Sequence, residues 1–280
     1  MTVLVTGGAG YIGSHMVHAL VDAGERVVVL DDLATGFDWA VAQGASLVIG
    51  DVGDQPRVVA LIAEHRVDAI IHFAASAVVP DSVSDPLGYY HNNTVNSLAL
   101  IESAVKGRVS HFIFSSTAAV YGNPERIPVR EDDATVPTSP YGSSKLMTEI
   151  MLRDAGTAYG LRYVILRYFN VAGADPLGRT GQSTKRATHL IKVSIETALG
   201  LRPKVDVFGT DYPTPDGTCI RDYIHVSDLV RAHCDALAYL RGRGESVRLL
   251  AVTAQFFRAR GDRHGRAVSR IDFEVAFVGQ

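Results

Sequence analysis

A tyrosine and a lysine four positions apart, Tyr141 and Lys145, have the types and spacing needed for acid-base chemistry. On a helix, residues at this spacing share one face, so the ammonium group can lie close to the phenol oxygen. A nearby positive charge favours the phenolate and lowers the tyrosine pKa from about 10 toward the range of a general base. The pair therefore predicts a catalytic base, Tyr141, activated by Lys145, although the same spacing also occurs by chance.

A hydroxyl group is predicted to join this pair. The apolar run at residues 111–115 is typical of a buried strand and continues into Ser116 and Thr117. At the carboxyl end of such a strand, the Thr117 hydroxyl would point into the cleft beside Tyr141 and help to pass the proton of a substrate hydroxyl. The alternative is a threonine turn, in which this hydroxyl only satisfies the local backbone.

The beginning of the chain must position these groups. Residues 2–6 form a short apolar run, glycines follow at Gly7, Gly10 and Gly13, and residues 15–23 carry apolar side chains at helical spacing. This order predicts a strand, a tight turn and a helix whose free N–H groups face a pyrophosphate. Gly7 and Gly10 allow the close turn, and Gly13 lets the helix pack on its strand. A glycine-rich hairpin turn is the alternative.

An acidic residue then favours one cofactor. A second apolar run, residues 26–30, ends at Asp31, where a βαβ unit places the carboxylate that accepts hydrogen bonds from an adenosine ribose. Because a carboxylate there disfavours a 2′-phosphate, the predicted cofactor is NAD rather than NADP. Lys145 could then also donate to the nicotinamide ribose. The alternative for Asp31 is a solvated carboxylate at a strand end.

Apolar runs alternate with helical patterns, which predicts an α/β fold with a doubly wound, Rossmann-like parallel sheet. We expect an NAD-binding domain over residues 1–170, with 222–240 returning to it. Residues 171–221 and 241–280 are expected to form a smaller, incomplete substrate lobe. Further strands are expected at 46–49, 69–73, 111–115, 163–166 and 222–226, and helices at 55–65, 86–106, 140–159, 188–199 and 228–239.

Composition limits the class of protein. The net charge is −3 with both signs interspersed, so nothing indicates nucleic-acid binding or a membrane surface. The sequence begins directly with the first strand and has no apolar run long enough to span a membrane, so we expect a soluble, cytoplasmic protein. Cys219 and Cys234 fit neither a disulfide framework nor a metal site, and no bound metal is predicted.

Short motifs in a fixed order carry a family resemblance. The segment FGTDYPTPDGT at 208–218 is more specific than any of the cofactor motifs; the others are the glycine turn, Asp31, Asp51-Val52, 72–75, 115–117, 141–145, 167–170 and 221–226. Together they resemble the extended short-chain dehydrogenase/reductases. Within that superfamily, residues 1 to about 246 are most similar to the UDP-glucose 4-epimerase family.

The resemblance implies two sets of contacts, one with NAD and one with a UDP-sugar substrate. Acidic residues would hold the adenosine half of NAD, and residues of the lobe would hold the sugar, the diphosphate and the uracil. The implied NAD contacts are Gly7, Gly10, Tyr11, Ile12, Gly13, Asp31, Asp32, Asp51, Val52, Phe73, Ala74, Ala75, Asn92, Ser115, Tyr141, Lys145 and Tyr168. The implied substrate contacts are Thr117, Tyr141, Asn170, His189, Phe208 and Arg221.

The reaction implied by the resemblance is the interconversion of UDP-glucose and UDP-galactose. Tyr141 would take the proton of the 4-hydroxyl while C4 delivers hydride to NAD, and the 4-keto sugar would rotate and take the hydride back on its other face. Sugar-nucleotide 4,6-dehydratases carry an acid pair after the threonine, so Ala118 and Ala119 argue against dehydration. A 4-epimerase for an N-acetylhexosamine or a uronate, and a sugar-nucleotide reductase, are alternatives.

The end of the sequence departs from the epimerase pattern. Ala77 and His189 already replace a lysine and an asparagine found in many members, and residues 248–268 are rich in Arg and Gly without a helical period. We interpret 248–268 as a stretch read from a shifted frame; a genuine basic loop is the alternative. Because the family's later nucleotide-binding residues would lie beyond Gln280, NAD binding is expected to survive better than UDP-sugar binding. An NAD-binding protein without turnover is the competing possibility.

A homodimer is also expected. The predicted helices at 86–106 and 140–159 are apolar enough to pair across a two-fold axis, and the family resemblance implies a dimer built in this way. The alternative is that the chain's own tail covers these faces.

Overall fold

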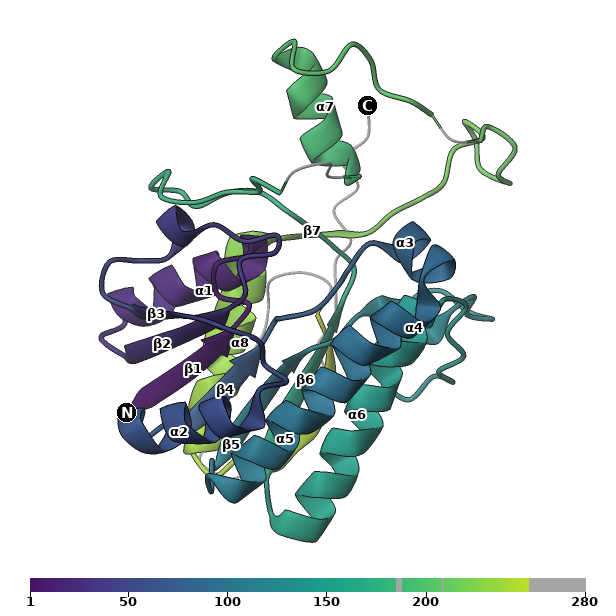
Figure 1. Cartoon of the computed structure of the whole chain (residues 1–280). Helices are drawn as coiled ribbons and strands as arrows, with labels where there is room; N and C mark the ends of the chain where they lie inside the picture. Colours follow the sequence, from purple (N-terminus) through teal and green to yellow (C-terminus); the bar gives the residue numbers. More distant parts are fainter. Residues whose placement is uncertain (185–187, 208, 252–280) are drawn as a thin grey trace, which may run out of the picture.

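Within the described residues, 1–184, 188–207 and 209–251, seven parallel strands form the central sheet of this computed structural model (Figure 1). Their order is β3-β2-β1-β4-β5-β6-β9, which confirms the predicted doubly wound α/β fold. The strands are β1 (Thr2–Thr6), β2 (Arg26–Asp31), β3 (Ser46–Ile49), β4 (Ala69–His72), β5 (His111–Ser115), β6 (Arg162–Tyr168) and β9 (Val247–Ala251).

The direction of winding reverses between β1 and β4. The chain runs from β1 through α1 (Tyr11–Asp22) to β2 and β3 on one side, and then crosses to β4 on the other side. At such a switch point the loops after the two strands diverge and leave a crevice at their carboxyl ends. The glycine turn follows β1 and Phe73 follows β4, so both predicted cofactor segments lie at this crevice.

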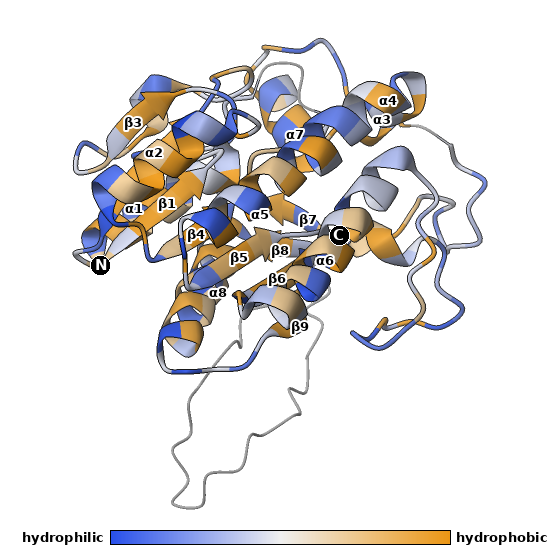
Figure 2. Cartoon of the chain, turned by 60° about the horizontal axis from the view of Figure 1, so that its bottom comes forward, coloured by the Kyte–Doolittle hydropathy of each residue, from blue (hydrophilic) through white to orange (hydrophobic). Residues whose placement is uncertain are grey.

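Helices cover both faces of the sheet (Figures 1 and 2). Side chains alternate between the faces of a strand, so Val3 and Val5 join one core cluster with α1 and α8, and Leu4 joins the other with α2, α5 and α6. None of the described helices is long and apolar enough to cross a membrane. The helices are α2 (Gln55–His65), α3 (Val79–Ser84), α5 (Asn96–Lys106), α6 (Pro140–Tyr159) and α8 (Val226–Arg241), with short 3₁₀ turns at Asp38–Ala40 and Ala118–Tyr121.

The segment expected as one helix at 86–106 is built from three pieces. Helix α4 (Pro86–Tyr89) leads into a π-helical turn (Tyr90–Val95) that continues as α5. Such turns often lie at functional sites. Asn93 in this turn accepts from the Ser76 N–H at 2.8 Å and donates to the Ser76 carbonyl at 2.9 Å and to the Ser144 hydroxyl at 3.1 Å. The π turn therefore fastens the loop after β4 to helix α6.

The described part of the lobe is small. Strands β7 (Asn170–Ala172) and β8 (Tyr223–His225) pair in a sheet of their own, so the expectation that 222–226 rejoins the main sheet is wrong. Both edges of β6 are already paired with β5 and β9, and β8 therefore pairs with β7, the continuation of β6. Helix α7 (Leu190–Ala198) stands away from the sheet and has no buried residue (Figure 1).

Candidate active site

Helix α6 carries the predicted catalytic pair in its first two turns. It begins at Pro140, whose fixed φ suits a first helical position, and the Ser139 hydroxyl caps it by accepting from the Gly142 N–H at 3.2 Å. Tyr141 and Lys145 follow one turn apart. The capped start therefore fixes where both side chains enter the site.

The Lys145 ammonium is buried against the end of β5. Its Nζ donates to the Ser115 carbonyl oxygen at 3.1 Å and lies 5.0 Å from the centre of the Phe114 ring. Burial disfavours the charged form and lowers the pKa of Lys145 to about 8. The Ser115 hydroxyl shares a hydrogen bond with the Tyr168 hydroxyl on β6, so two neighbouring strands hold the lysine's acceptor in place.

The pKa of the Tyr141 phenol is raised, which contradicts the lowering predicted from the sequence. Burial is the largest cause, and the hydrogen bond with the Thr117 hydroxyl, which favours the phenolate, offsets part of it. Lys145 does not contribute to the shift in the pKa of Tyr141, because the Lys145 ammonium group is directed to the Ser115 carbonyl. In the chain alone, Tyr141 is therefore a protonated phenol held by Thr117.

Thr117 makes both of the contacts that the sequence left as alternatives. Its Oγ1 accepts from the Ala119 N–H at 3.1 Å and so caps the turn Ala118–Tyr121. The same hydroxyl hydrogen-bonds with Tyr141. The local turn thus fixes the hydroxyl in the position from which it reaches the phenol.

Lys145 gives a testable dependence of stability on pH. The folded chain has a Lys145 pKa of about 8, whereas an unfolded lysine titrates near 10.4, so between these values the unfolded state binds more protons. The free energy of unfolding should therefore rise by up to about 1.4 kcal/mol per pH unit above pH 8, relative to a Lys145→Met variant. Urea unfolding of both proteins at pH 7.0, 8.5 and 9.5 measures this difference. A difference that stays constant over this range would contradict the buried, desolvated lysine.

The glycine turn has the geometry that a dinucleotide requires. Gly7 has a φ of +71°, and a Cβ there would lie 2.5 Å from the Ala74 backbone nitrogen. A Cβ on Gly13 would lie 2.1 Å from the Gly7 carbonyl oxygen, so helix and turn touch through backbone alone. Gly10 is the N-cap of α1 and supplies no capping side chain. The free N–H groups of the first turn, which includes Tyr11 and Ile12, are therefore left for a phosphate.

Asp31 lies at the carboxyl end of β2 and is almost fully buried. Its two carboxylate oxygens accept from the N–H groups of Ala9 and Leu33, each at 2.9 Å, and burial raises its pKa. These bonds hold the carboxylate beside the glycine turn, and each oxygen can still accept a ribose hydroxyl. Asp32 is exposed and accepts from the Ala34 N–H at 2.9 Å.

The other predicted NAD contacts lie along the same edge of the sheet. Asp51 accepts from the Gly53 N–H at 2.7 Å and from the Asn96 amide at 3.0 Å, and Val52 beside it is buried. The Phe73 ring packs 4.9 Å from the ring of His233 in the core. The remaining members of this set are Ala74, Ala75 and Asn92, of which Asn92 donates to the Ser76 hydroxyl at 2.9 Å.

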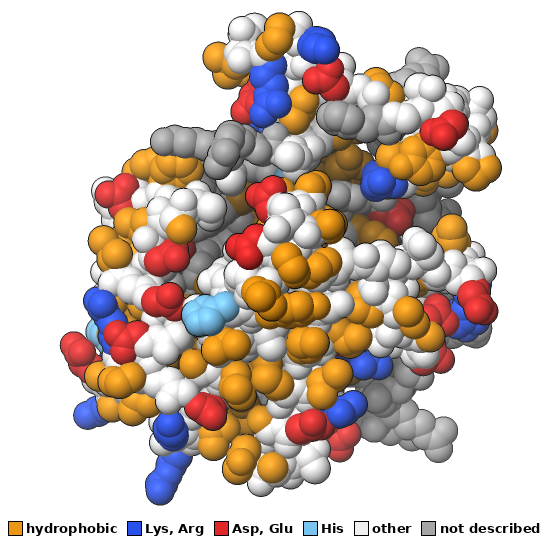
Figure 3. Space-filling model, turned by 45° about the vertical axis from the view of Figure 1, so that its right-hand side comes forward, with side chains coloured by type: hydrophobic (Ala, Val, Ile, Leu, Met, Phe, Trp, Pro, Cys, Tyr) orange, Lys and Arg blue, Asp and Glu red, His pale blue; other side chains and the backbone are white. Residues whose placement is uncertain are grey.

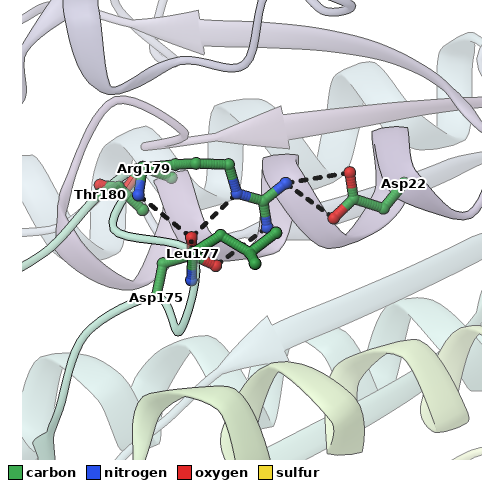
Figure 4. A network of polar contacts seen from close by, with 6 residues as sticks. Asp22, Asp175, Leu177, Arg179 and Thr180 are labelled. Atoms are coloured by element: carbon green, nitrogen blue, oxygen red, sulfur yellow. Dashed lines mark hydrogen bonds and ion pairs between the residues drawn. The ribbon is translucent and has the colours of Figure 1, made fainter.

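The segment leading into the lobe is fastened to α1. Figure 4 shows the Arg179 guanidinium between two carboxylates: it donates to Asp22 of α1 at 2.8 and 3.0 Å and to Asp175 at 2.9 Å. The guanidinium holds the pKa of Asp175 well below its usual range. The Tyr11 hydroxyl adds a bond to the Gly173 carbonyl at 2.6 Å. The cofactor helix therefore also positions the start of the lobe, a contact that the sequence analysis did not predict.

The described substrate contacts predicted for the lobe form hydrogen bonds with residues near them in the lobe. Asn170 donates to the Asp222 carbonyl at 3.0 Å, and Arg221 is exposed and donates to the Ile220 carbonyl at 2.8 Å. His189 precedes α7 and bonds the Gln182 side chain at 2.8 Å. Phe208, together with residues 252–268 of the proposed frame shift, lies outside the described residues.

Comparisons with known proteins fit this geometry. Residues 3–248 match the model of the NAD dependent epimerase/dehydratase family. The chain belongs to this family. The match ends close to residue 246, where the resemblance read from the sequence ends, and membership confirms NAD as the cofactor.

Curated and solved members of the epimerase/dehydratase family are close in sequence. The chain is 59% identical over 265 residues to a UDP-glucose 4-epimerase of Azospirillum brasilense, covering 90% of this chain and 76% of that protein. It superposes with a TM-score of 0.88 on a UDP-glucose 4-epimerase of Brucella ovis in complex with NAD, at 46% identity over 91% of this chain and 78% of that one. An epimerase of Bifidobacterium longum in complex with NAD⁺ and UDP gives 0.84 at 36% identity, covering 89% and 77%.

Proposed function

We propose that this chain interconverts UDP-glucose and UDP-galactose by inverting the configuration at C4 of the sugar. The observation that carries the proposal is the hydrogen-bonded Tyr141 and Thr117 beside buried Lys145, in a chain 59% identical to a UDP-glucose 4-epimerase. Ala118 and Ala119 next to Thr117 carry no acid that could eliminate water. The chemistry at this site is therefore oxidation and reduction at one carbon.

The chain's own residues provide the acid-base part of the reaction. Tyr141 takes the proton of the sugar 4-hydroxyl, with the Thr117 hydroxyl between them as a bridge, and returns it when the 4-keto sugar is reduced. Lys145 keeps a positive charge next to this centre. NAD, when bound, would supply the acceptor and donor of the C4 hydride, and the positive charge of its oxidised form would favour the phenolate of Tyr141 and so oppose the effect of burial on its pKa.

Inversion requires that the ketone present its other face. The nucleotide diphosphate remains held while the sugar rotates about its bond to it, so the ketone behaves as an intramolecular reactant. We assign this holding role to Asn170, His189, Phe208 and Arg221. The NAD contacts proposed above lie on the main sheet, on its loops and on the helices packed against it, and none of them belongs to the small sheet of β7 and β8.

The activity is tested by incubating the chain with UDP-galactose and following the sugar anomeric signals by proton NMR. UDP-glucose should appear until the two sugars reach equilibrium. A parallel reaction with UDP-N-acetylgalactosamine shows whether the larger sugar is also a substrate. Full occupancy by NAD without any conversion of UDP-galactose would contradict the proposed function.

This chain is expected to bind NAD with an affinity within about tenfold of that of the Azospirillum relative. It is expected to bind UDP at least about tenfold more weakly than that relative, which is a loss of about 1.4 kcal/mol in binding free energy. The NAD contacts lie on a fully packed sheet, but α7 has no buried residue and Arg221 is exposed. Titration calorimetry with NAD, and then with UDP on the NAD-loaded chain, measures both constants. Equal retention of the two affinities would contradict this prediction.

We also propose a homodimer formed through α4, α5 and α6. Figure 3 shows hydrophobic side chains gathered on one face of the molecule. Exposed apolar residues of these helices include Leu87, Leu98, Met147 and Ile150, and Val95 of the π turn before α5 is exposed as well; Leu87 is 77% exposed. Pairing two such faces would stabilise a dimer, because burial of apolar surface contributes about 25 cal/mol of free energy per Å².

Replacing Leu98 and Ile150 together by glutamate is expected to convert the dimer to a monomer, since both would place charges in the interface. Light scattering after size exclusion measures the mass. Leu177→Glu, at an exposed loop position elsewhere, is the matched control and should leave the dimer intact. A parent chain of 30.1 kDa at every concentration would contradict the dimer.

A further inference from the structure

A buried ion pair lies directly behind the predicted catalytic residues. Arg167 on β6 is fully buried and Glu149 on α6 is 3% exposed. The guanidinium Nε and Nη2 donate to the two carboxylate oxygens at 2.9 and 2.6 Å, so the two groups meet as planar forks. The Ser116 hydroxyl donates to the same carboxylate at 2.6 Å.

Each member of this cluster is next to a residue of the site. Glu149 is one turn beyond Lys145 and two turns beyond Tyr141 on the same face of α6. Ser116 precedes Thr117, and Arg167 precedes Tyr168, which bonds Ser115. The three contacts therefore connect α6 and the loop after β5, which carry the acid-base groups, with strand β6.

The free energy of burying this ion pair does not by itself explain its presence. Taking two charges out of water is costly, and replacing a buried ion pair by apolar residues of similar volume is often neutral or stabilising. A rigid fork with an added hydroxyl donor instead fixes distance and orientation between the elements that it joins. Arg167 also lies over the Tyr121 ring at 4.8 Å, in the turn that Thr117 caps.

We infer that Glu149, Arg167 and Ser116 are positioning residues that set the hydrogen bond between Tyr141 and Thr117. They do not reach the substrate. The inference refines the proposed function, because it assigns the source of the geometry that the proton transfer requires. It predicts that removing the cluster disturbs the Tyr141–Thr117 bond in the chain itself, whether or not the chain turns over.

The test uses a readout that does not need activity. Tyrosine labelled with ¹³C at Cζ is introduced into the full chain, and the Tyr141 resonance is identified among eleven tyrosines by its absence in Tyr141→Phe. Thr117→Ala gives the position of this resonance when the hydrogen bond is lost. Two variants are compared at pH 8: Ser116→Ala alone, and Ser116→Ala with Glu149→Met and Arg167→Met, which leaves no buried charge or hydroxyl of the cluster unpaired.

In the triple variant the Tyr141 resonance should move at least half of the way toward its position in Thr117→Ala. Where the parent is active, kcat should fall about tenfold or more with KM nearly unchanged, because ground-state binding is not affected. Arg241→Met is the matched control, since Arg241 joins Glu25 and Asp68 at the opposite edge of the sheet at 2.5 and 3.0 Å. It should lower the unfolding temperature without moving the resonance.

A folded triple variant whose Tyr141 resonance stays at the parent position would overturn the inference. If the triple variant does not fold, Ser116→Ala decides: a shift supports the inference, and an unchanged resonance contradicts it. The failure of the proposed function is separate, because it would be seen as absence of turnover in the parent, whereas the resonance is measured without substrate.

Discussion

Replacing Tyr141 by phenylalanine is expected to lower kcat about 10³-fold, within the range that general acid-base groups contribute. The variant keeps the ring and loses only the oxygen that takes the proton from the sugar. Thr117 retains its bond to the Ala119 N–H, so the turn and the fold should persist. Initial rates of UDP-galactose conversion and NAD content of the purified variant are the two measurements.

The matched control for this substitution is Tyr163→Phe. Tyr163 lies on β6 but packs with the cluster on the face that holds α2, α5 and α6, away from the glycine turn. Its loss of a hydroxyl should leave kcat within about twofold, as is usual for substitutions outside a site. Turnover by Tyr141→Phe at more than about a tenth of the parent rate would show that another group acts as the base.

Replacing Gly13 by alanine is expected to weaken NAD binding by at least about 100-fold, or about 2.7 kcal/mol. The new Cβ would lie 2.1 Å from the Gly7 carbonyl oxygen and 2.8 Å from the Gly8 Cα, and both are backbone atoms that no rotamer change can move. Relief of the contact must separate α1 from the turn, which displaces the N–H groups that face the phosphates. Calorimetric titration with NAD measures the loss, and thermal unfolding reports on the fold.

Gly10→Ala in the same turn is a control that distinguishes loss of NAD binding from loss of the fold. Its Cβ would lie 3.3 Å from the Gly7 carbonyl, a contact that a small shift can accommodate, so the unfolding temperature should change little. NAD affinity should fall less than in Gly13→Ala. Parent-like NAD binding by a folded Gly13→Ala would mean that the turn does not hold the pyrophosphate.

The fold class and the cofactor could be predicted from the sequence because their signals are local. A buried parallel strand is a continuous apolar run, and the glycines at 7 and 13 stand where backbone must touch backbone. The proposal of Tyr141, Lys145 and Thr117 as catalytic residues likewise rests on their spacing and on the place of Thr117 after a strand. The structure places Thr117 in contact with Tyr141 and buries Lys145 beside them.

What could not be predicted depends on burial, which sequence spacing does not reveal. Helical spacing predicts that Lys145 shares a face with Tyr141, but it does not predict the direction of the Lys145 ammonium group. Because this ammonium group donates to the Ser115 carbonyl, it does not offset the effect of burial, which raises the pKa of Tyr141. Glu149 and Arg167 are charged, and charged residues are usually exposed, yet this pair is buried behind the proposed site. The π turn at Tyr90–Val95 keeps a helical pattern of apolar residues, so its sequence predicts an ordinary α-helix.

The missed residues share one weak signal. Glu149 follows Lys145 at the same spacing that separates Tyr141 from Lys145, so it continues the helix face that carries the proposed catalytic pair. A charged residue that continues a buried face needs a partner of opposite charge, and Arg167, which directly follows the apolar run 164–166 of β6, meets that need. The segment 173–180 carries no such pattern, and its contacts with α1 follow from tertiary structure alone.

In the proposed reaction a hydride leaves C4 of the sugar and returns to the same carbon, while Tyr141 moves the proton of the 4-hydroxyl. The most direct test is incubation of the chain with UDP-galactose that carries deuterium at C4, in ordinary water, followed by mass spectrometry and NMR of the UDP-glucose formed. The product is expected to keep the deuterium at C4, because a hydride held in the site does not exchange with solvent. UDP-glucose with hydrogen from water at C4 would contradict it.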